Sequence, residues 1–474
     1  MMPEKKYQKL KLSSLVLLAV TLPGCALLGP DYERPDAKVP AQFSEKDITT
    51  EQASAVVSSS WWELYQDPVL NDLVQKARSN NTDVKVAVAR VEEADAALRE
   101  VGAALYPEVD LNSTATRSRV TEAGAFPVFN GLNPRNDFTV GLGTTFELDF
   151  WGKLRRAKES ARAQALATRY AKDTVDLSLS GLVASNYLLL RSLEAQITVS
   201  KDNLRSRDES LALTKRRLQG GVASALEVNQ AESASANIEA QIAELVRQRA
   251  ITEHQLAVLT GDLNLKITEG DINNLPIPPV PPAGLPSSLL EARPDVRQAE
   301  QNMIAANAKI GVAKAALYPS ISLTGDFGGE SIELSDILKS AARIWSLGLS
   351  LNLPIFDSGR LESKVDQASA QQKQALASYV GSVQTAFKEV NDALVTVRQS
   401  AEREAALNRS QQAAKQALQI ADNRYKSGYS AYLDVLDAQR VYNEAALAYI
   451  QSRQARLVAT VDLFKALGGG WKAE

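Results

Sequence analysis

Four stretches of this chain alternate apolar and polar residues. The clearest covers 137–150, a matching stretch covers 343–356, and weaker alternation covers about 108–120 and 319–329. Period-two alternation over about ten residues predicts β-strands with one apolar and one polar face. Such strands suit either a sheet on a soluble core or a membrane sheet whose polar face lines a lumen.

Long helices are predicted between and after these strands. Apolar residues over 361–397 recur at spacings of three, four or their sum. Proline, which helix interiors exclude, is absent between residues 134 and 276 and again after 354. At ~1.5 Å per residue, a helix over 359–428 is roughly 100 Å long. Its narrow, alanine-rich stripe favours close coiled-coil contacts, so we expect a bundle or tube of helices, with a solid rod as the alternative.

The two halves of the chain follow one plan. Ala103-Ala104-Leu105-Tyr106-Pro107 recurs as Ala315-Ala316-Leu317-Tyr318-Pro319, Asp83-Val84 as Asp295-Val296, Gly152-Lys153-Leu154 as Gly359-Arg360-Leu361, and the segment from Gly221 as the segment from Gly428. Four matches in the same order indicate a duplicated unit. We predict a first repeat over 81–270, a Pro-rich linker over 271–292 and a second repeat over 293–474. Each repeat has one helix, two strands and two long helices that meet at a glycine break.

The N-terminus predicts export and a lipid anchor. Residues 1–24 join a basic start to an apolar run about half as long as the ~20 residues that a membrane-spanning helix needs, which is typical of a signal peptide. The sequence Leu22-Pro23-Gly24-Cys25 resembles the bacterial lipoprotein box, which implies acylation of Cys25, the only cysteine. Ala26 after it favours the outer membrane by the same resemblance. We expect 25–80 to form a lipid-anchored segment; the alternative is an ordinary signal peptide with an incidental cysteine.

The anchor decides between the two kinds of sheet. A chain held at the outer membrane favours strands with one face toward lipid. Four strands cannot close a barrel, which needs at least about eight, and open strand edges are not tolerated in lipid. We therefore expect other copies of the chain to complete the sheet.

Composition excludes several classes of protein. The 474 residues carry 53 Lys+Arg against 56 Asp+Glu, a balance that argues against a nucleic-acid binder. A mean hydropathy of −0.19 excludes a polytopic helical membrane protein, and 45% hydrophobic residues exclude a disordered chain. One His (His254), one Cys and three Met leave no zinc site and no soft-metal lining. No catalytic constellation is recognisable, and Gly468-Gly469-Gly470 lacks the strand and lysine of a phosphate loop, so we expect neither an enzyme nor a cofactor beyond the lipid on Cys25.

The motifs together resemble a known family. The duplicated plan, the lipoprotein box, Ala-Ala-Leu-Tyr-Pro in both halves and the run Gly428-Tyr429-Ser430-Ala431-Tyr432-Leu433-Asp434-Val435-Leu436-Asp437-Ala438-Gln439-Arg440 are similar to the TolC-type outer membrane factors, in particular the lipid-anchored, OprM-like (NodT-type) branch. The resemblance covers 25–471. It implies a homotrimer whose copies form a twelve-stranded outer-membrane β-barrel and a twelve-helix periplasmic α-barrel with an equatorial domain. It also implies a periplasmic adaptor and an RND-type inner-membrane pump as partners.

The resemblance places a gate at the second glycine break. Leu433, Asp437 and Arg440 are spaced by four and three residues and so share one helix face. In the family the matching positions line the periplasmic entrance, which implies an apolar constriction at Leu433 and a carboxylate ring at Asp437 that favours cations. Further gate residues implied in this way, as ties of the closed tip, are Asp434, Tyr425 and Glu227. Ser430 stands where some relatives have Arg. The alternative is a solvated acidic helix face.

The helix tips are also the natural contact surface for the adaptor. The residues singled out there are Arg217 and Gly221 in the first repeat and Arg424 and Gly428 in the second. The function implied is a passive exit channel of a tripartite efflux pump for drugs or other small toxic compounds. The alternatives are a channel of a protein-secretion system and a non-conducting coiled-coil envelope lipoprotein.

Overall fold

The structure, a computed structural model, describes residues 27–36, 40, 43, 58–121, 123, 133–280 and 289–471. The predicted signal peptide, the predicted acylation site Cys25 and residues 281–288 of the Pro-rich linker lie outside the described residues. The chain divides into two compact units, which are described separately. The first contains Glu92–Ala167, Glu300–Ser378 and the described residues before Asp36, and the second contains Asp36–Val91, Thr168–Ala299 and the residues from Tyr379 onward.

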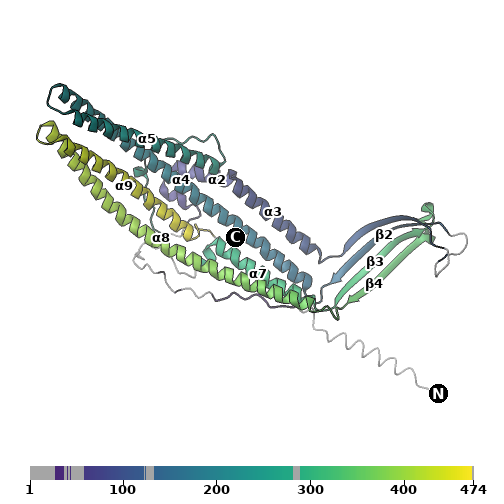
Figure 1. Ribbon diagram of the computed structural model, residues 1–474. Helices are drawn as coiled ribbons and strands as arrows, with labels where there is room; N and C mark the ends of the chain where they lie inside the picture. Colours follow the sequence, from purple (N-terminus) through teal and green to yellow (C-terminus); the bar gives the residue numbers. More distant parts are fainter. Residues whose placement is uncertain are drawn as a thin grey trace, which may run out of the picture. The chain divides into compact units, whose positions relative to one another are not determined.

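The first unit holds one antiparallel four-stranded sheet. Its strands, in the order in which they lie side by side, are β1 (Glu108–Ser118), β2 (Arg135–Leu148), β3 (Ser320–Ser331) and β4 (Arg343–Asn352) (Figure 1). They lie in the four stretches whose alternation predicts strands. β2 of the first repeat pairs with β3 of the second, so both repeats contribute to the sheet. Within the described chain, β1 and β4 each have one neighbouring strand and form its two edges.

The two faces of the sheet differ in chemistry. One row across the four strands consists of Leu111, Leu142, Phe327 and Trp345. The adjacent row, on the other face, consists of Asp110, Gly143, Asp326 and Ser346. The large apolar side chains are open to their surroundings in a single copy, with Trp345 73% and Leu111 70% exposed. A contiguous apolar face of this kind indicates a surface for lipid or for another protein.

Two strands end earlier than the alternation predicts. β2 stops at Leu148 because Asp149 turns back to cap the following helix, its carboxylate accepting hydrogen bonds from the N–H groups of Leu154 (3.1 Å) and Arg155 (3.0 Å). β4 stops at Asn352, ahead of Pro354, which has no N–H to give to a strand ladder.

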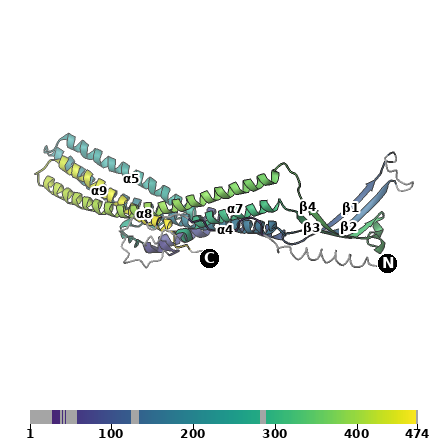
Figure 2. The ribbon, with the colours of Figure 1, turned by 90° about the horizontal axis from the view of Figure 1, so that it is seen from below.

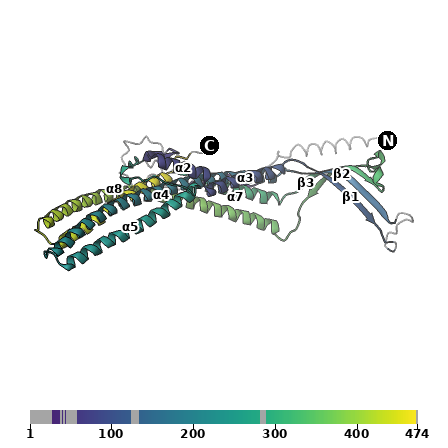
Figure 3. The same ribbon diagram turned by 90° about the horizontal axis from the view of Figure 1, so that it is seen from above.

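Each repeat has one shorter helix ahead of its strands and two long helices in a region that contains no proline. They are α3 (Thr82–Ala103), α4 (Lys153–Gln219) and α5 (Ala225–Thr260) in the first repeat, and α7 (Pro294–Ala315), α8 (Arg360–Lys426) and α9 (Tyr432–Ala466) in the second. α4 and α8 have 67 residues each. Within the second unit α5 runs beside α4 and α9 beside α8 (Figures 2 and 3). None of the described helices combines the length and the apolar composition needed to cross a bilayer.

Short elements complete the second unit. They are η2 (Trp61–Tyr65), α2 (Pro68–Asn80), η3 (Ile272–Asn274) and α6 (Leu289–Ala292). The first unit adds η5 (Leu334–Asp336) and η6 (Ser340–Ala342) between β3 and β4. The largest apolar core lies in the second unit, where Trp61 stacks on Phe464 at 5.4 Å and the buried hydroxyl of Tyr65 donates to the carbonyl of Leu457 (3.0 Å). This core fastens the N-terminal elements to α4, α5 and α9.

Candidate functional site at the helix tips

Both long helices end in the same glycine turn. In the first repeat the N–H of Gly221 donates to the carbonyl of Leu218 (3.0 Å) and the N–H of Val222 to that of Arg217 (2.9 Å). In the second repeat Gly428 and Tyr429 make the matching bonds to Tyr425 and Arg424. This is the Schellman arrangement, which needs a left-handed residue. Gly221 and Gly428 supply it with φ of +74° and +81°, and a Cβ at either would have nothing within 4 Å, so backbone conformation selects glycine here.

The helices that return from the tips start differently. The Ser224 hydroxyl accepts a hydrogen bond from the N–H of Glu227 at 3.3 Å and so caps α5. The equivalent residue before α9 is Ala431, which has no side chain to cap with. Glu227 and Asp434 lie in the first turns of α5 and α9, where carboxylates offset the helix dipole. The N-terminus of α9 therefore lacks the side-chain cap that stabilises the N-terminus of α5.

At the tips a small buried cluster joins the helix pair α4/α5 to the helix pair α8/α9. It consists of Ala231, Tyr425, Tyr432 and Val435. The rings of Tyr425 and Tyr432 lie 5.3 Å apart, and the Arg217 guanidinium lies 4.4 Å above the Tyr425 ring. Arg217 also donates to the Tyr425 carbonyl at 3.3 Å. Two residues singled out from the sequence for different roles, Arg217 and Tyr425, therefore meet inside one chain and link α4 to α8.

Buried polar atoms without hydrogen-bond partners occur in this cluster and in residues near it. Among the described residues they include the Tyr425 hydroxyl, the Ser430 hydroxyl, Arg207 Nε and Gln439 Oε1. Burial lowers the pKa of Arg207. Burial, and then the neighbouring Tyr425, raise the pKa of Tyr432 to about 12. Unpaired buried polar groups cost free energy. A rearrangement of the tip that gives these atoms hydrogen-bond partners would remove that cost.

The remaining gate residues line the exposed face of α9. Leu433 is 63% exposed, and Asp434 and Asp437 are exposed on the same side of the helix start. Arg440 pairs with Asp437 at 2.6 Å and with Glu444 at 3.1 Å. These hydrogen bonds raise the pKa of Arg440. Arg440 thus forms its ion pairs within its own chain, and it offsets part of the negative charge that the sequence assigns to Asp437.

The other tip residues surround this face. Arg424 is exposed, and its carbonyl closes the glycine turn. Val222 (76% exposed) and Tyr429 (79%) follow the two glycines and present apolar surface in both repeats. Sequence reasoning missed Tyr432, Arg207 and Gln439. Tyr432 lies inside the recognised motif, but nothing in a single sequence distinguishes its buried ring from the exposed ring of Tyr429.

The polar face of the sheet is a second acidic surface. Its register places Glu108, Asp110, Asp137, Glu147, Asp326 and Glu330 on that face. Lys153 neutralises Glu147 at 3.0 Å, and Ser346 donates to Asp326 at 2.9 Å. Within the described parts of the chain, no group of three or more His, Cys, Asp or Glu is arranged to hold a metal ion. The carboxylates on this face are suited to attract cations.

Known proteins resemble this chain in sequence and in structure. The family model described as outer membrane efflux protein matches residues 73–262 and 285–469. The chain is 34% identical over 468 residues to the toluene efflux pump outer membrane protein TtgC of Pseudomonas putida, covering 97% of this chain and 96% of that one. It is 32% identical over 458 residues to the cation efflux system protein CusC of Escherichia coli, with 96% and 98% coverage. The structure resembles the open state of the MtrE outer membrane channel of Neisseria gonorrhoeae, with a TM-score of 0.86, 30% identity and 94% and 99% coverage.

Proposed function

This chain belongs to the outer membrane efflux protein family, and from that premise we propose that it is the outer membrane channel of a tripartite efflux pump. It is a passive duct that receives small toxic compounds from an inner-membrane pump and a periplasmic adaptor and releases them outside the cell. Its relatives include efflux channels named for toluene and for cations. Because relatives with one architecture serve such different compounds, we infer that the channel is a passive duct and that the inner-membrane pump selects the compound.

The two-faced sheet carries this proposal. Its apolar face is exposed in a single copy, and its opposite face is rich in carboxylates, hydroxyls and glycines. Lipid on one side and water on the other account for both faces. The edges β1 and β4 must pair with other copies, since open edges are not tolerated in lipid. The resemblance to the TolC-type outer membrane factors implies three copies and a twelve-stranded barrel, and it is our basis for the homotrimer.

The helix tips supply the gate and the docking surface. In a trimer, three copies of α4, α5, α8 and α9 form the periplasmic tunnel. Leu433 then narrows its entrance, and Asp437 adds negative charge there, partly offset by its pair with Arg440. Tyr425, Asp434 and Glu227 hold neighbouring tip segments in place. The adaptor contacts the turns at Arg217, Gly221, Arg424 and Gly428, which project from the ends of the helix pairs and carry exposed apolar side chains next to the glycines.

The N-terminal segment supports a lipid anchor on Cys25. Leu28 donates its N–H to the carbonyl of Trp151 at 3.2 Å, at the junction of β2 and α4. The buried Arg156 donates to the carbonyl of Leu28 (3.2 Å) and to the carboxylate of Asp31 (2.6 Å). Leu28 is thus bound at the junction of the proposed membrane sheet and α4, which supports an acyl anchor three residues earlier in the sequence, at Cys25.

Complementation of a deletion strain tests the proposal. We expect loss of the gene to raise susceptibility to drugs and dyes, and the wild-type gene to restore resistance. A Cys25→Ser variant should restore it less well, because the protein loses its anchor. A deletion strain whose susceptibility to every tested compound equals that of the parent contradicts an efflux role.

A further inference from the structure

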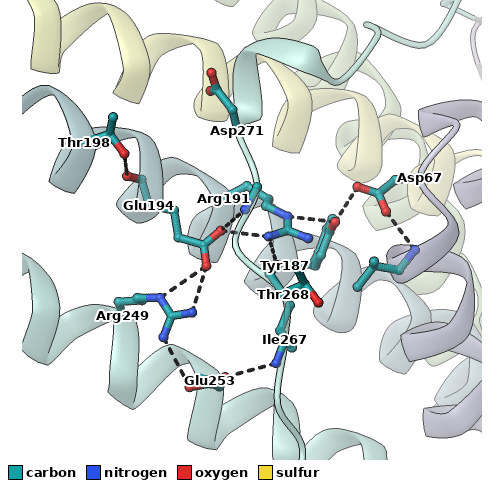
Figure 4. Close-up of polar contacts among 12 residues, drawn as sticks. Asp67, Tyr187, Arg191, Glu194, Thr198, Arg249, Glu253, Ile267, Thr268 and Asp271 are labelled. Atoms are coloured by element: carbon teal, nitrogen blue, oxygen red, sulfur yellow. Dashed lines mark hydrogen bonds and ion pairs between the residues drawn. The ribbon is translucent and has the colours of Figure 1, made fainter.

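A buried carboxylate on α4 gathers hydrogen bonds from three elements. Glu194, whose side chain is 5% exposed, accepts from Arg191 on its own helix (2.8 Å) and from Arg249 of α5 (3.0 Å) (Figure 4). It also accepts from the backbone N–H of Gly270, in the segment after α5 (3.0 Å). Arg249 donates in addition to Glu253. The four charges balance, and each carboxylate oxygen has a donor, which is the condition for a buried ion cluster to hold its geometry.

The segment that follows α5 is held by this cluster. Arg191 donates to the carbonyl of Thr268 at 2.6 Å, and Glu253 accepts from the N–H of Ile267 at 3.2 Å (Figure 4). Gly270 allows the close approach, because a Cβ there would lie 2.7 Å from Arg191 Cζ. The segment is thus bound to the first helix pair by side chains that grip its backbone.

The second helix pair grips the same segment a few residues further on. Arg453 of α9 donates to the carbonyls of Ile272 (3.1 Å), Asn273 (3.3 Å) and Leu275 (2.7 Å). Its remaining nitrogen pairs with Glu404 of α8 at 3.0 Å, and Arg456 supports the same carboxylate at 2.8 Å. Glu404 is 7% exposed in its side chain, so this clamp is buried as well. We name residues 267–275 the latch segment.

Apolar side chains reinforce both clamps. Ile267, Ile272 and Leu275 of the latch segment are buried, with Ile272 at 0% exposure. They share one core with Leu190 of α4, Leu256 of α5 and Leu457 of α9. The latch segment therefore contributes side chains to the space between the pairs as well as backbone groups to the arginines.

On the tip side of the clamps the contact between the pairs changes character. There α4 and α9 make hydrogen bonds between uncharged side chains, each with at least one amide: Gln196 with Gln451 (3.1 Å), Asn203 with Asn443 (2.6 Å) and the Ser210 hydroxyl with Gln439 (3.4 Å). Water can replace such neutral hydrogen bonds at little cost. We refer to these three contacts as the amide seam.

We propose that the latch segment, gripped by Arg191 and Glu194 from one helix pair and by Arg453 and Glu404 from the other, ties the two pairs together and keeps the amide seam closed. The inference rests on the proposed function in one respect, that the tips move during opening. The latch then confines that motion to the tip side of the clamps. Releasing either grip breaks the polar tie that the latch segment makes between the two pairs.

Thiol accessibility at the amide seam measures this directly. Asn443 is 6% exposed, and an Asn443→Cys variant of the full-length protein places a buried thiol in the seam; the only native cysteine is Cys25. The probe is a maleimide that labels the thiol only when the seam opens. Arg191→Met and Arg453→Met release one grip each. Gly270→Ala displaces the Arg191 guanidinium without removing a charge, which keeps the test available should Arg191→Met fail to fold.

We expect each release to speed labelling about tenfold or more, the factor associated with losing charge-assisted hydrogen bonds. The double variant Arg191→Met/Arg453→Met should label no faster than the faster single variant, because one released grip already breaks the tie through the latch segment. Arg247→Met, which removes an exposed pair with Glu244 on α5, should label at the parent rate.

Parent-like labelling in all release variants overturns the proposal. So does a double variant whose acceleration is the product of the single effects, since that result describes two independent supports. Labelling is read on purified protein and needs no transport. A wild type that fails to conduct therefore refutes the proposed function and leaves the latch result standing.

Discussion

Replacing Leu349 with arginine should prevent stable insertion of the protein in the outer membrane. Leu349 is 70% exposed on the apolar face of β4, opposite Leu323 of β3. The next residue, Ser350, points to the polar face opposite Ser322, so Ser350→Arg is a matched control one position away. The two variants add the same side chain to the same strand on opposite faces.

The expected difference follows from the solvent on each face. Arginine on the lipid face of a membrane strand costs about 2–4 kcal/mol near the bilayer midplane and less toward its edges. In a trimer this amounts to about 6–12 kcal/mol, comparable with the whole stability of a domain. If the face were in water, the same substitution of an exposed leucine would change stability by no more than about 0.5 kcal/mol.

Two measurements separate these outcomes. Fractionated cells report how much full-length protein reaches the outer membrane, and urea unfolding of liposome-inserted protein reports its stability. We expect Leu349→Arg to be depleted and destabilised, and Ser350→Arg to resemble wild type. Equal behaviour of the two variants would refute the assignment of the apolar face to lipid.

Three further predictions concern the tips. Asp434→Ala with Asp437→Ala should raise single-channel conductance in planar bilayers and reduce cation preference, because negative charge and tip contacts at the entrance are lost; unchanged conductance contradicts the gate assignment. Tyr425→Phe removes a buried hydroxyl that has no partner among the described residues and should stabilise the protein by about 1 kcal/mol in thermal unfolding, whereas Tyr429→Phe, at a 79% exposed ring, should have no effect. Ser224→Ala should destabilise the start of α5 by about 1 kcal/mol and Ala431→Ser should stabilise the start of α9 by a similar amount, which hydrogen exchange of the two tips measures; the idea fails if both tips exchange as in wild type.

Repetition and periodicity in the sequence account for most of the fold. The strands and long helices lie where alternation and the absence of proline place them. Alternation reflects the solvent that each strand face meets, and proline is absent because it interrupts the hydrogen bonds of a helix interior. The ends of the strands are harder to predict from the sequence. Alternation continues past Leu148 and Asn352, while Asp149 and Pro354 decide where strand pairing stops.

Burial and long-range contacts at the tip and in the latch segment could not be predicted from the sequence. The motif from Gly428 to Arg440 locates the tip, but the burial of Tyr432 within it depends partly on Ala231, which is about 200 positions away in the sequence. The grip of Arg453 on carbonyls of 272–275 has no sequence signature, because any residue offers the same carbonyl. Arginine and glutamate counts alone do not reveal which pairs are buried.

Current recorded across planar lipid bilayers containing the purified, full-length, lipid-bearing protein tests most directly that copies of this chain form a transmembrane duct. We expect discrete, cation-preferring current steps from a protein whose mass in detergent is that of three copies. Protein that stays monomeric in detergent and carries no current would contradict a channel built from shared sheets.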